Sequence, residues 1–447
     1  MLKMFAFIVL SLSFSAYGQN HAQVQQRVTE AFNKRAADDF LIGSSVGYMD
    51  QEGQLELNLG AVTSSHQKFE IGSISKSFTG IVLAQLVLEN KVQLSTPLEE
   101  VIPELRGTYA GSVTLKLLAN HKARFVRNHP DGDATLEVAL INYLKHYTPG
   151  PKDPAQGEKR YSNLGFATLG LVISRLTGKS YSDAVRERIF LPLGMIDSGF
   201  LTSLEEHSNL LTPHNVLLQP TSADVSSDLP SASGGITSSL HDMMKFLALN
   251  YQPDSAVQLA QQECLGFDST PSEVYIWKNG GMTGFSTLML IDPVNKKATI
   301  VLSNSNNNSS VDRLALTALG VTDTYKSDLK IPSDFSHAVV GKYFNKKLHF
   351  YLDLVTTPNG FLGFILSQKL DGNNTWATRL FTEDRQKFFF LGRGWTSKDH
   401  IEFKTNPDSG LKEIIMREFD KDDENGNPIY IENIFIPVPA EMLKSKA

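Results

Sequence analysis

The 447-residue chain has a single cysteine, Cys264, so no disulfide bond can form within it and its stability must come from packing. No Cys/His nucleophile motif surrounds Cys264, and we interpret it as a structural thiol. The chain also lacks lysine- and arginine-rich runs, and its formal net charge is −6. This charge pattern offers no basic surface for a phosphate backbone, so we expect no nucleic acid partner.

Motifs that bind metals or nucleotide cofactors are missing as well. The sequence has no His-Glu-x-x-His run, no paired Cys-x-x-Cys and no glycine-rich phosphate loop. The acidic run Asp420 to Gly426 has the composition of a calcium loop, but its glycine falls one position late and no glutamate follows at the required distance. We interpret that run as a solvated turn, and we expect neither a metal nor a cofactor.

A long apolar run occurs only at the N-terminus. Lys3 precedes an apolar stretch from Met4 to Phe14, and Ala16 and Gly18 are the small residues of a cleavage site. We interpret residues 1–18 as a signal peptide, which predicts a periplasmic or secreted protein, and the alternative is a buried N-terminal helix. No later stretch reaches the roughly 20 apolar residues that cross a bilayer, so we expect no membrane span after cleavage.

The length of the chain favours two domains, because single hydrophobic cores stop growing at about 250–300 residues. Strands near both ends of residues 22–322, with helices between them, predict an α+β domain built on one antiparallel sheet flanked by helices. Short alternating runs separated by turns over residues 331–447 predict an all-β sandwich or barrel.

Hydrophobic periodicity places the elements of the first domain. The helices are expected at 24–40, 75–90, 115–120, 165–176, 182–189 and 239–250. The strands are expected at 46–48, 55–59, 274–278, 286–291 and 298–303, with a polar loop at 304–310. The helix at 75–90 is strongly apolar, which is typical of a central, buried helix.

Ser73 stands at the start of that apolar helix, in the run Gly72-Ser73-Ile74-Ser75-Lys76. A serine hydroxyl is a poor nucleophile and needs a base within hydrogen-bond reach. Lys76 lies three residues later on the same helix face, and burial near another cation lowers the pKa of a lysine. We therefore predict that Ser73 is a nucleophile and that Lys76 is its activating partner.

Tyr161 and Asn163 follow Ser73 along the chain in the run Tyr161-Ser162-Asn163. A phenol beside cationic Lys76 and Lys278 would ionise more easily, so we predict that Tyr161 acts as a general base or acid. The amide of Asn163 is predicted to hydrogen-bond a substrate amide.

Lys278, Gly280 and Gly281 form the next group, in the run Lys278-Asn279-Gly280-Gly281 at a predicted strand end. The charge of Lys278 is predicted to bind a substrate carboxylate. The Gly281 N–H is predicted to complete an oxyanion hole with the N–H of Ser73. These residues complete a site for forming and hydrolysing an acyl-enzyme.

Two other serine motifs compete with Ser73. The pattern Ser-x-x-Lys recurs at Ser327 to Lys330, which we interpret as a linker because no apolar helix follows it. The run Gly43 to Gly47 fits the Gly-x-Ser-x-Gly elbow of α/β-hydrolases, with Ser45 as its serine. That elbow requires strand, turn and helix, whereas here a helix precedes and a strand follows, so we interpret Ser45 as structural.

Together, Ser73-x-x-Lys76, Tyr161-x-Asn163 and Lys278-x-Gly280 resemble the three motifs of the penicillin-recognising serine hydrolases. The tyrosine form is similar to class C β-lactamases and the related DD-peptidases and esterases, over about Ala22 to Thr322. The β-rich tail, with Val340-Gly341-Lys342-Tyr343 near its start, resembles the lipocalin-like domains of some relatives.

This resemblance implies a small-molecule or peptide substrate, either peptidoglycan-like or a β-lactam. A D-Ala-D-Ala-type carboxypeptidase or endopeptidase acting through a Ser73 acyl-enzyme is our first hypothesis. A class C-like β-lactamase, a carboxylesterase and a slow-deacylating penicillin-binding or ligand-sensing protein are the alternatives. The family's usual His-Thr-Ser-Gly-like turn is replaced by His121 to Arg124, and Asn279 replaces a threonine, so substrate shape stays open, as does oligomeric state.

Overall fold

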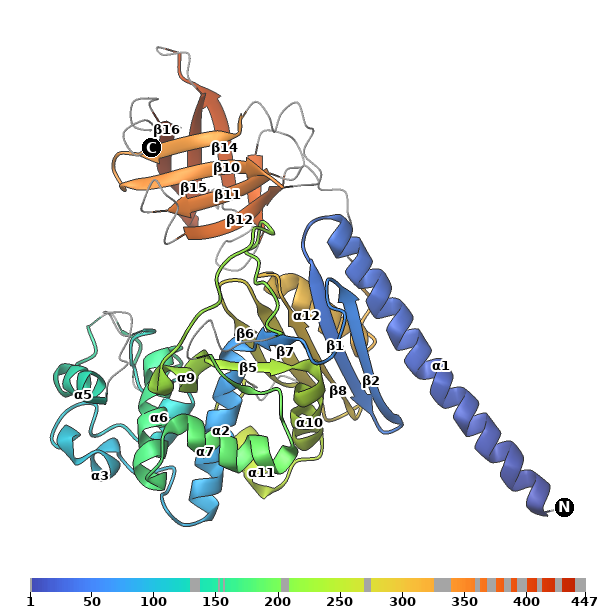
Figure 1. Cartoon of the computed structure of the whole chain (residues 1–447). Helices are drawn as coiled ribbons and strands as arrows, with labels where there is room; N and C mark the ends of the chain where they lie inside the picture. The colour runs from blue at the N-terminus through green and yellow to red at the C-terminus, as the bar shows by residue number, and fades with distance from the viewer. Residues whose placement is uncertain are drawn as a thin grey trace. The chain divides into compact units, whose positions relative to one another are not determined.

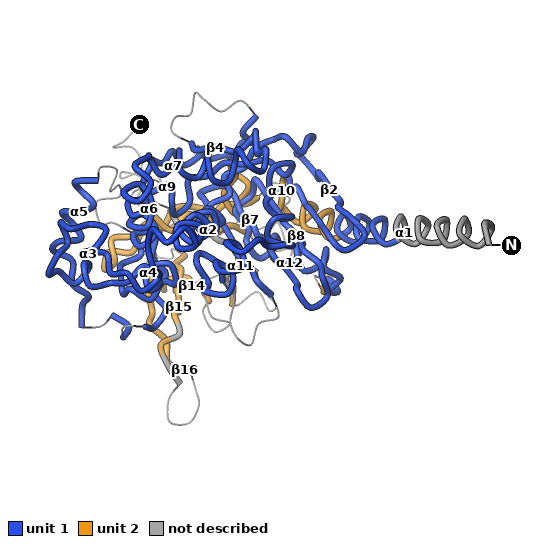
Figure 2. The backbone as a smooth tube through the Cα atoms, turned by 90° about the horizontal axis from the view of Figure 1, so that it is seen from below, with its two compact units in different colours: residues 1–30, 43–213, 220–323 blue, residues 31–42, 214–219, 324–447 orange. Residues whose placement is uncertain are grey.

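The fold is described from a computed structural model of the chain (Figure 1). The structure describes residues 2–128, 137–151, 153–155, 157–201, 209–268, 275–324, 339–357, 362–367, 375–381, 387–391, 400–407, 412–422 and 428–438. The chain divides into two compact units (Figure 2). The first holds residues 1–30, 43–213 and 220–323, and the second holds residues 31–42, 214–219 and 324–447.

Helices form much of the first unit, and the last residues of α1 belong to the second. In chain order they are α1 (Leu2–Ala37), η1 (Gly72–Ile74), α2 (Ser75–Leu88), α3 (Leu98–Val101), η2 (Pro103–Leu105), α4 (Leu115–Ala119), α5 (Glu137–His146), α6 (Asn163–Thr177), α7 (Tyr181–Val185), η3 (Arg186–Phe190), α8 (Leu191–Leu193), α9 (Asp228–Gly234), α10 (Leu240–Tyr251), α11 (Ser255–Gln262) and α12 (Asn308–Ala318). Among them, no described helix is long and apolar enough to cross a membrane.

The main sheet of the first unit has five antiparallel strands in the order β2-β1-β8-β7-β6. They are β1 (Gly43–Asp50), β2 (Gly53–Gly60), β6 (Ile276–Gly281), β7 (Ser286–Asp292) and β8 (Lys297–Ser303). Strands from the two ends of the unit therefore share one sheet, as the sequence predicts. β6 forms an edge of this sheet, and a smaller sheet holds β3 (Lys68–Glu70), β5 (Ile236–Ser239) and β4 (Gly199–Phe200).

Helices cover both faces of the main sheet. Successive residues of a strand point to opposite faces, so the neighbours Gly47 and Tyr48 of β1 show what packs on each side. On one face, a Cβ added to Gly47 would stand 2.3 Å from the sulfur of Met244 in α10. On the other face, the ring of Tyr48 meets that of His21 in α1, with centroids 5.8 Å apart. Gly47 thus allows the close packing of α10 against β1 that Figure 1 shows.

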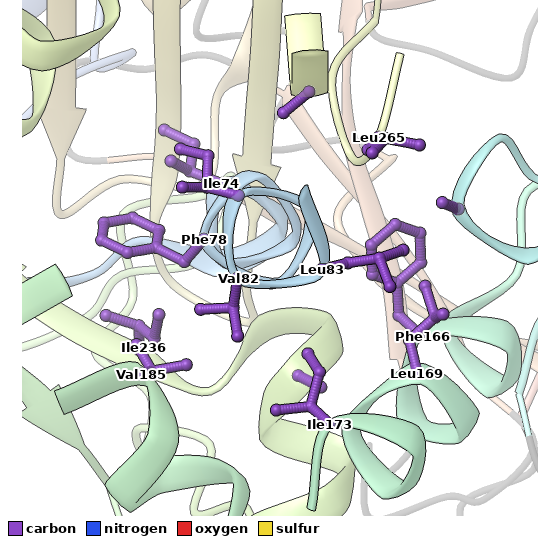
Figure 3. Close-up of a cluster of buried hydrophobic side chains, with 14 of the residues drawn as sticks. Ile74, Phe78, Val82, Leu83, Phe166, Leu169, Ile173, Val185, Ile236 and Leu265 are labelled. Atoms are coloured by element: carbon purple, nitrogen blue, oxygen red, sulfur yellow. The ribbon is translucent and has the colours of Figure 1, made fainter. Parts of the chain in front are cut away.

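Helix α2 lies at the centre of the hydrophobic core, as its apolar sequence predicts. Its side chains are buried on nearly all sides, and Phe78, Val82 and Leu83 lie among the core residues drawn in Figure 3. The loop after α11 packs so closely on α2 that a Cβ on Gly80 would stand 1.8 Å from the carbonyl oxygen of Leu265. This close contact leaves no space for a side chain between α2 and the loop after α11.

Helix α6 begins two residues earlier than the sequence predicts, so Asn163 is its first residue. Ser162 caps it by accepting a hydrogen bond from the Gly165 N–H at 2.9 Å. At the other end, Gly178 adopts a φ of 69°, which suits a residue without a Cβ. The cap fixes the direction in which Tyr161-Ser162-Asn163 enters the helix.

Two further elements differ from the prediction in the type of structure they form. The predicted helix at 182–189 is α7 followed by a π-helical turn, η3, which inserts an extra residue into the helical repeat. The predicted polar loop at 304–310 overlaps α12, because Asn307 accepts a hydrogen bond from the Ser310 N–H and caps that helix. Polar cap residues are common to loops and helix starts, and the sequence alone does not separate them.

The second unit is built on a closed antiparallel barrel of eight strands in the order β10-β11-β12-β13-β14-β15-β16-β9. The strands are β9 (Gly341–Asn345), β10 (Phe350–Thr356), β11 (Leu362–Ser367), β12 (Thr375–Phe381), β13 (Lys387–Leu391), β14 (His400–Thr405), β15 (Lys412–Asp422) and β16 (Pro428–Pro437). Pairing of β16 with β9 closes the barrel, with Ile436 opposite Phe344. Of the two predicted arrangements, sandwich or barrel, the structure has the barrel.

Candidate active site

Ser73 occupies η1, immediately before the buried helix α2, and is partly exposed. Gly72 has a φ of 54°, and a Cβ on it would stand 2.8 Å from the backbone nitrogen of Gly281 in β6. A side chain at position 72 would therefore push β6 away as well as strain the backbone. Glycine here lets the nucleophile lie against the edge strand.

Lys76 is fully buried, and its amine has three oxygen atoms around it. It donates to Asn163 Oδ1 at 2.8 Å and to the carbonyl oxygen of Ser233, and Ser73 Oγ lies 3.2 Å away. Burial, helped by the charges of Lys278 and Arg127, lowers the pKa of Lys76 well below its ordinary value. This is the direction that the sequence predicts.

A neutral Lys76 amine has two N–H bonds and one lone pair. Asn163 and the Ser233 carbonyl accept the two hydrogens, so the lone pair is left for the hydroxyl of Ser73. The amine is thus held in the state and orientation that can remove the proton from the nucleophile.

Tyr161 makes the other contact with the nucleophile, since its hydroxyl oxygen lies 2.5 Å from Ser73 Oγ. Burial raises the pKa of this phenol, although the hydrogen bond with Ser73 and the charge of Arg127 oppose the rise. The prediction that nearby cations would make Tyr161 ionise more easily is therefore wrong: desolvation outweighs them. The raised pKa favours the neutral phenol, and a neutral hydroxyl can either donate to Ser73 Oγ or accept from it.

Asn163 contacts protein groups at both ends of its amide. Its oxygen accepts from Lys76, and its nitrogen donates to Asn128 Oδ1 at 2.8 Å. The backbone N–H of Asn163 also donates to the carbonyl oxygen of Arg127, at 2.7 Å. The structure therefore gives this side chain a role in orienting Lys76, and its predicted contact with a substrate amide stays a prediction.

Lys278 lies on β6 and is buried, with 1% of its surface exposed. Its amine donates to Asp268 Oδ2 at 2.6 Å, and Lys159 donates to Asp268 Oδ1 at 2.5 Å. Burial alone would raise the pKa of Asp268, but the charges of Lys278 and Lys159 lower it below its ordinary value. One carboxylate thus faces two ammonium groups beside the nucleophile.

Gly280 and Gly281 follow on the same edge strand. A Cβ on Gly280 would stand 2.0 Å from the carbonyl oxygen of Ile71, so only glycine fits between β6 and the residues before Ser73. The two glycines bring the strand backbone next to the nucleophile, which is the arrangement an oxyanion hole requires.

His121, Arg127 and Asp268 were not predicted as site residues. Burial and the charges of Lys76 and Lys278 lower the pKa of His121 to about 2, so its ring is neutral. Its Nδ1 accepts from the Ser162 N–H at 3.1 Å, and its ring lies 4.4 Å from that of Tyr161. His121 therefore positions Tyr161. The sequence feature that could have indicated this role is the turn at 121–124, which differs from the turn usual in the resembled family.

The competing serine lies elsewhere. Ser45 is in the middle of β1, is fully buried, and donates to Asn58 Oδ1 at 2.8 Å. It does not stand between a strand and a helix, as a nucleophile elbow would. The second Ser-x-x-Lys copy, at Ser327 to Lys330, lies outside the described residues. Within the described part of the chain, no three His, Cys, Asp or Glu side chains are arranged to hold a metal ion.

The sequence profile of the Beta-lactamase family matches residues 41–322, which is most of the first unit. The chain belongs to the beta-lactamase family. It is 25% identical over 279 residues to the Beta-lactamase of Providencia stuartii, across 60% of this chain and 70% of that protein. It is 23% identical over 303 residues to Protein flp of Staphylococcus aureus strain MW2, across 59% of this chain and 57% of that protein.

Solved structures agree with this membership of the beta-lactamase family at the level of the fold. A class C beta-lactamase in complex with cefoxitin superposes with a TM-score of 0.59 at 20% identity, over 67% of this chain and 99% of that chain. The Beta-Lactamase/D-Alanine Carboxypeptidase from Pseudomonas syringae superposes with a TM-score of 0.60 at 20% identity, over the same shares. The predicted α+β fold and the prediction of a serine hydrolase are confirmed.

Proposed function

We propose that this serine hydrolase acts on D-alanyl peptides of the cell wall, as a carboxypeptidase or endopeptidase. The observation that carries the proposal is the nucleophile with two partners: Ser73 Oγ lies 3.2 Å from the Lys76 amine and 2.5 Å from the Tyr161 hydroxyl. Support for the D-alanyl substrate comes from the likeness to a protein described as a Beta-Lactamase/D-Alanine Carboxypeptidase.

The proposed reaction begins when Ser73 Oγ attacks the carbonyl carbon of the scissile amide and its proton passes to Lys76. The backbone N–H groups of Ser73 and Gly281 stabilise the oxyanion. Lys76, through Tyr161, returns the proton to the leaving nitrogen as the C–N bond breaks. Water then attacks the acyl-enzyme, its proton is taken by the same pair, and Ser73 is released with a free acid as product.

A β-lactam is the second candidate substrate, because the chain is similar to the Beta-lactamase of Providencia stuartii. An ester would use the same groups. These substrates differ in leaving group and in the rate of deacylation, so turnover separates them. A protein that acylates rapidly and deacylates slowly would act as a penicillin-binding or sensing protein.

The test incubates the protein with a fluorescent penicillin, nitrocefin, a D-alanyl muropeptide and a simple aryl ester. We expect covalent labelling by the penicillin and release of D-alanine from the muropeptide, with both lost in Ser73→Ala. Ser45→Ala is the matched control, since Ser45 is a buried serine outside the site. Labelling that survives Ser73→Ala but is lost in Ser45→Ala would contradict the proposal.

Export is a second part of the proposal, and it is based on the N-terminal sequence. We expect cleavage after Gly18 and a mature protein in the periplasm or medium. N-terminal sequencing of the protein from fractionated cells tests this, and an intact N-terminus on protein from the cytosol would contradict it.

A further inference from the structure

The guanidinium of Arg127 lies beside the ring of Tyr161, and the three motifs do not include this arginine. Arg127 is exposed, and its guanidinium carbon lies 5.0 Å from the centre of the Tyr161 ring. The hydroxyl of that ring is the group hydrogen-bonded to Ser73. Arg127 also contributes to lowering the pKa of Lys76, so its charge acts at the centre of the site.

The backbone of Arg127 is fixed to the start of α6. Its carbonyl oxygen accepts from the N–H groups of Asn163, at 2.7 Å, and Leu164, at 3.3 Å. The next residue, Asn128, accepts from the Asn163 side chain at 2.8 Å. The backbone from which the Arg127 side chain projects is therefore held by Asn163, the residue whose side chain also contacts Lys76.

Each of the other basic side chains of the site already has a protein partner or a lowered pKa. Asp268 lies between Lys278 and Lys159 and forms an ion pair with each. Lys76 has a lowered pKa, and the neighbouring Arg124 donates to the carbonyl oxygens of Gly150 and Asp153, both at 3.5 Å. In the described ranges, Arg127 forms no ion pair with a carboxylate.

We propose that Arg127 binds a carboxylate of the acyl substrate, the role that the motifs assign to Lys278. This inference rests on the proposed acyl hydrolase function. A guanidinium presents two parallel N–H donors to a carboxylate, and an exposed arginine keeps them accessible to an incoming ligand. Lys278, held by Asp268, is instead a fixed charge inside the protein that positions the edge strand. Arg127 is thus a specificity-determining residue for substrates with a free carboxylate near the scissile bond.

The test compares two substrates that differ in one group: an acyl-D-alanyl thioester ending in a free carboxylate, and the same thioester with that carboxylate amidated. The measured quantity is the ratio of their kcat/KM values. We expect Arg127→Gln to lower this ratio by about tenfold to a hundredfold, since a hydrogen-bonded charge pair contributes about 1.5–3 kcal/mol. Arg127→Lys should retain part of the preference for the substrate with the free carboxylate. Arg124→Gln is the matched control and should leave it unchanged.

The inference would be overturned if Arg127→Gln had the same kcat/KM ratio as wild type. It would also be overturned if the preference for the free carboxylate were lost in Lys278→Met and in no other variant. Labelling of Ser73 by an uncharged fluorophosphonate, measured in every variant, separates this failure from failure of the proposed function. Wild-type protein that is labelled but shows no carboxylate preference contradicts the role of Arg127 alone. Wild-type protein with no labelling at Ser73 contradicts the acyl hydrolase itself.

Discussion

Two buried lysines, Lys76 and Lys278, lie close to the Tyr161 ring, and their surroundings differ. The amine of Lys76 is 4.8 Å from the centre of the Tyr161 ring, and that of Lys278 is 5.4 Å away. Among the described residues, the hydrogen bonds of the Lys76 amine all go to uncharged oxygen atoms, whereas Lys278 forms an ion pair with Asp268. Burial without an opposite charge favours the neutral amine, while a paired carboxylate favours the ammonium.

This difference favours a different role for each lysine. Lys76 can accept the proton of Ser73 because its charged form is destabilised. Lys278 contributes to that destabilisation through its own charge, and Asp268 partly offsets it. A lysine in a motif therefore becomes a base or a fixed charge according to its partner, and substitutions of the partners test this directly.

Removal of Lys76 is expected to have the largest effect. Lys76→Ala should slow acylation of Ser73 by at least about 10³-fold, because the nucleophile loses its base. Lys76→Arg should be equally slow, since an arginine does not lose its proton. Stopped-flow acylation by a chromogenic ester measures both. An Arg variant that keeps most of the rate would show that charge, rather than basicity, is what position 76 supplies.

Tyr161→Phe is expected to slow acylation by about 10–100-fold, a smaller loss than that from Lys76→Ala. The phenol is hydrogen-bonded to Ser73 and relays a proton, but its raised pKa prevents it from being the main base. The same stopped-flow assay compares the two variants. A Phe variant slower than Lys76→Ala would reverse the assigned roles.

Substitution of the ion pair should shift the pH dependence of acylation. Asp268 raises the pKa of Lys76 and Lys278 lowers it. Only the neutral amine is active, so the rate falls as pH drops through the pKa of Lys76. Asp268→Asn should move this acidic limb to lower pH, and Lys278→Met should move it to higher pH. Shifts in the same direction, or no shift, would contradict the coupling.

The sequence predicts those contacts of the site that are made by residues close together along the chain. Ser73 and Lys76 are one helical turn apart, so the three-residue spacing already brings them together. Asp268 could not be found in this way. It reaches Lys278 because its backbone bridges to Trp277, and no motif marks that bridge. The charge balance of the site depends on tertiary contacts that the spacing of residues does not encode.

The same limit applies to the fold. Alternating residues predict strands in the C-terminal region, but a sandwich and a barrel have the same alternation. Their difference lies in the pairing of β9 with β16, residues far apart in sequence. The direction of the Tyr161 pKa was missed for a related reason, since burial is a property of the folded chain.

Glu70 tests the effect of burial on an acid, as Lys76 does on a base. Burial, together with the charge of Asp224, raises the pKa of Glu70 from 4.5 to about 8. The folded state therefore keeps a proton that the unfolded chain releases above pH 4.5. This contribution to stability is complete below pH 4.5 and is lost as pH rises through about 8.

Glu70→Gln does not titrate, so its stability relative to wild type should increase by about 3–4 kcal/mol between pH 5 and pH 8. The amide oxygen can still accept the hydrogen bond that the Asp224 N–H now makes to Oε1. Urea unfolding at pH 5, 7 and 8.5 measures the difference. A difference that stays constant with pH would show that Glu70 is ionised in the folded protein.

The most direct test of the two-lysine account is a pH titration of the lysine side-chain signals by NMR, with Lys76 assigned from the Lys76→Arg variant. The account predicts that Lys76 loses its proton well below the ordinary value of 10.5 for a lysine. It also predicts that Asp268→Asn lowers this titration further. A Lys76 amine that stays protonated up to the ordinary value would contradict its assignment as the base that activates Ser73.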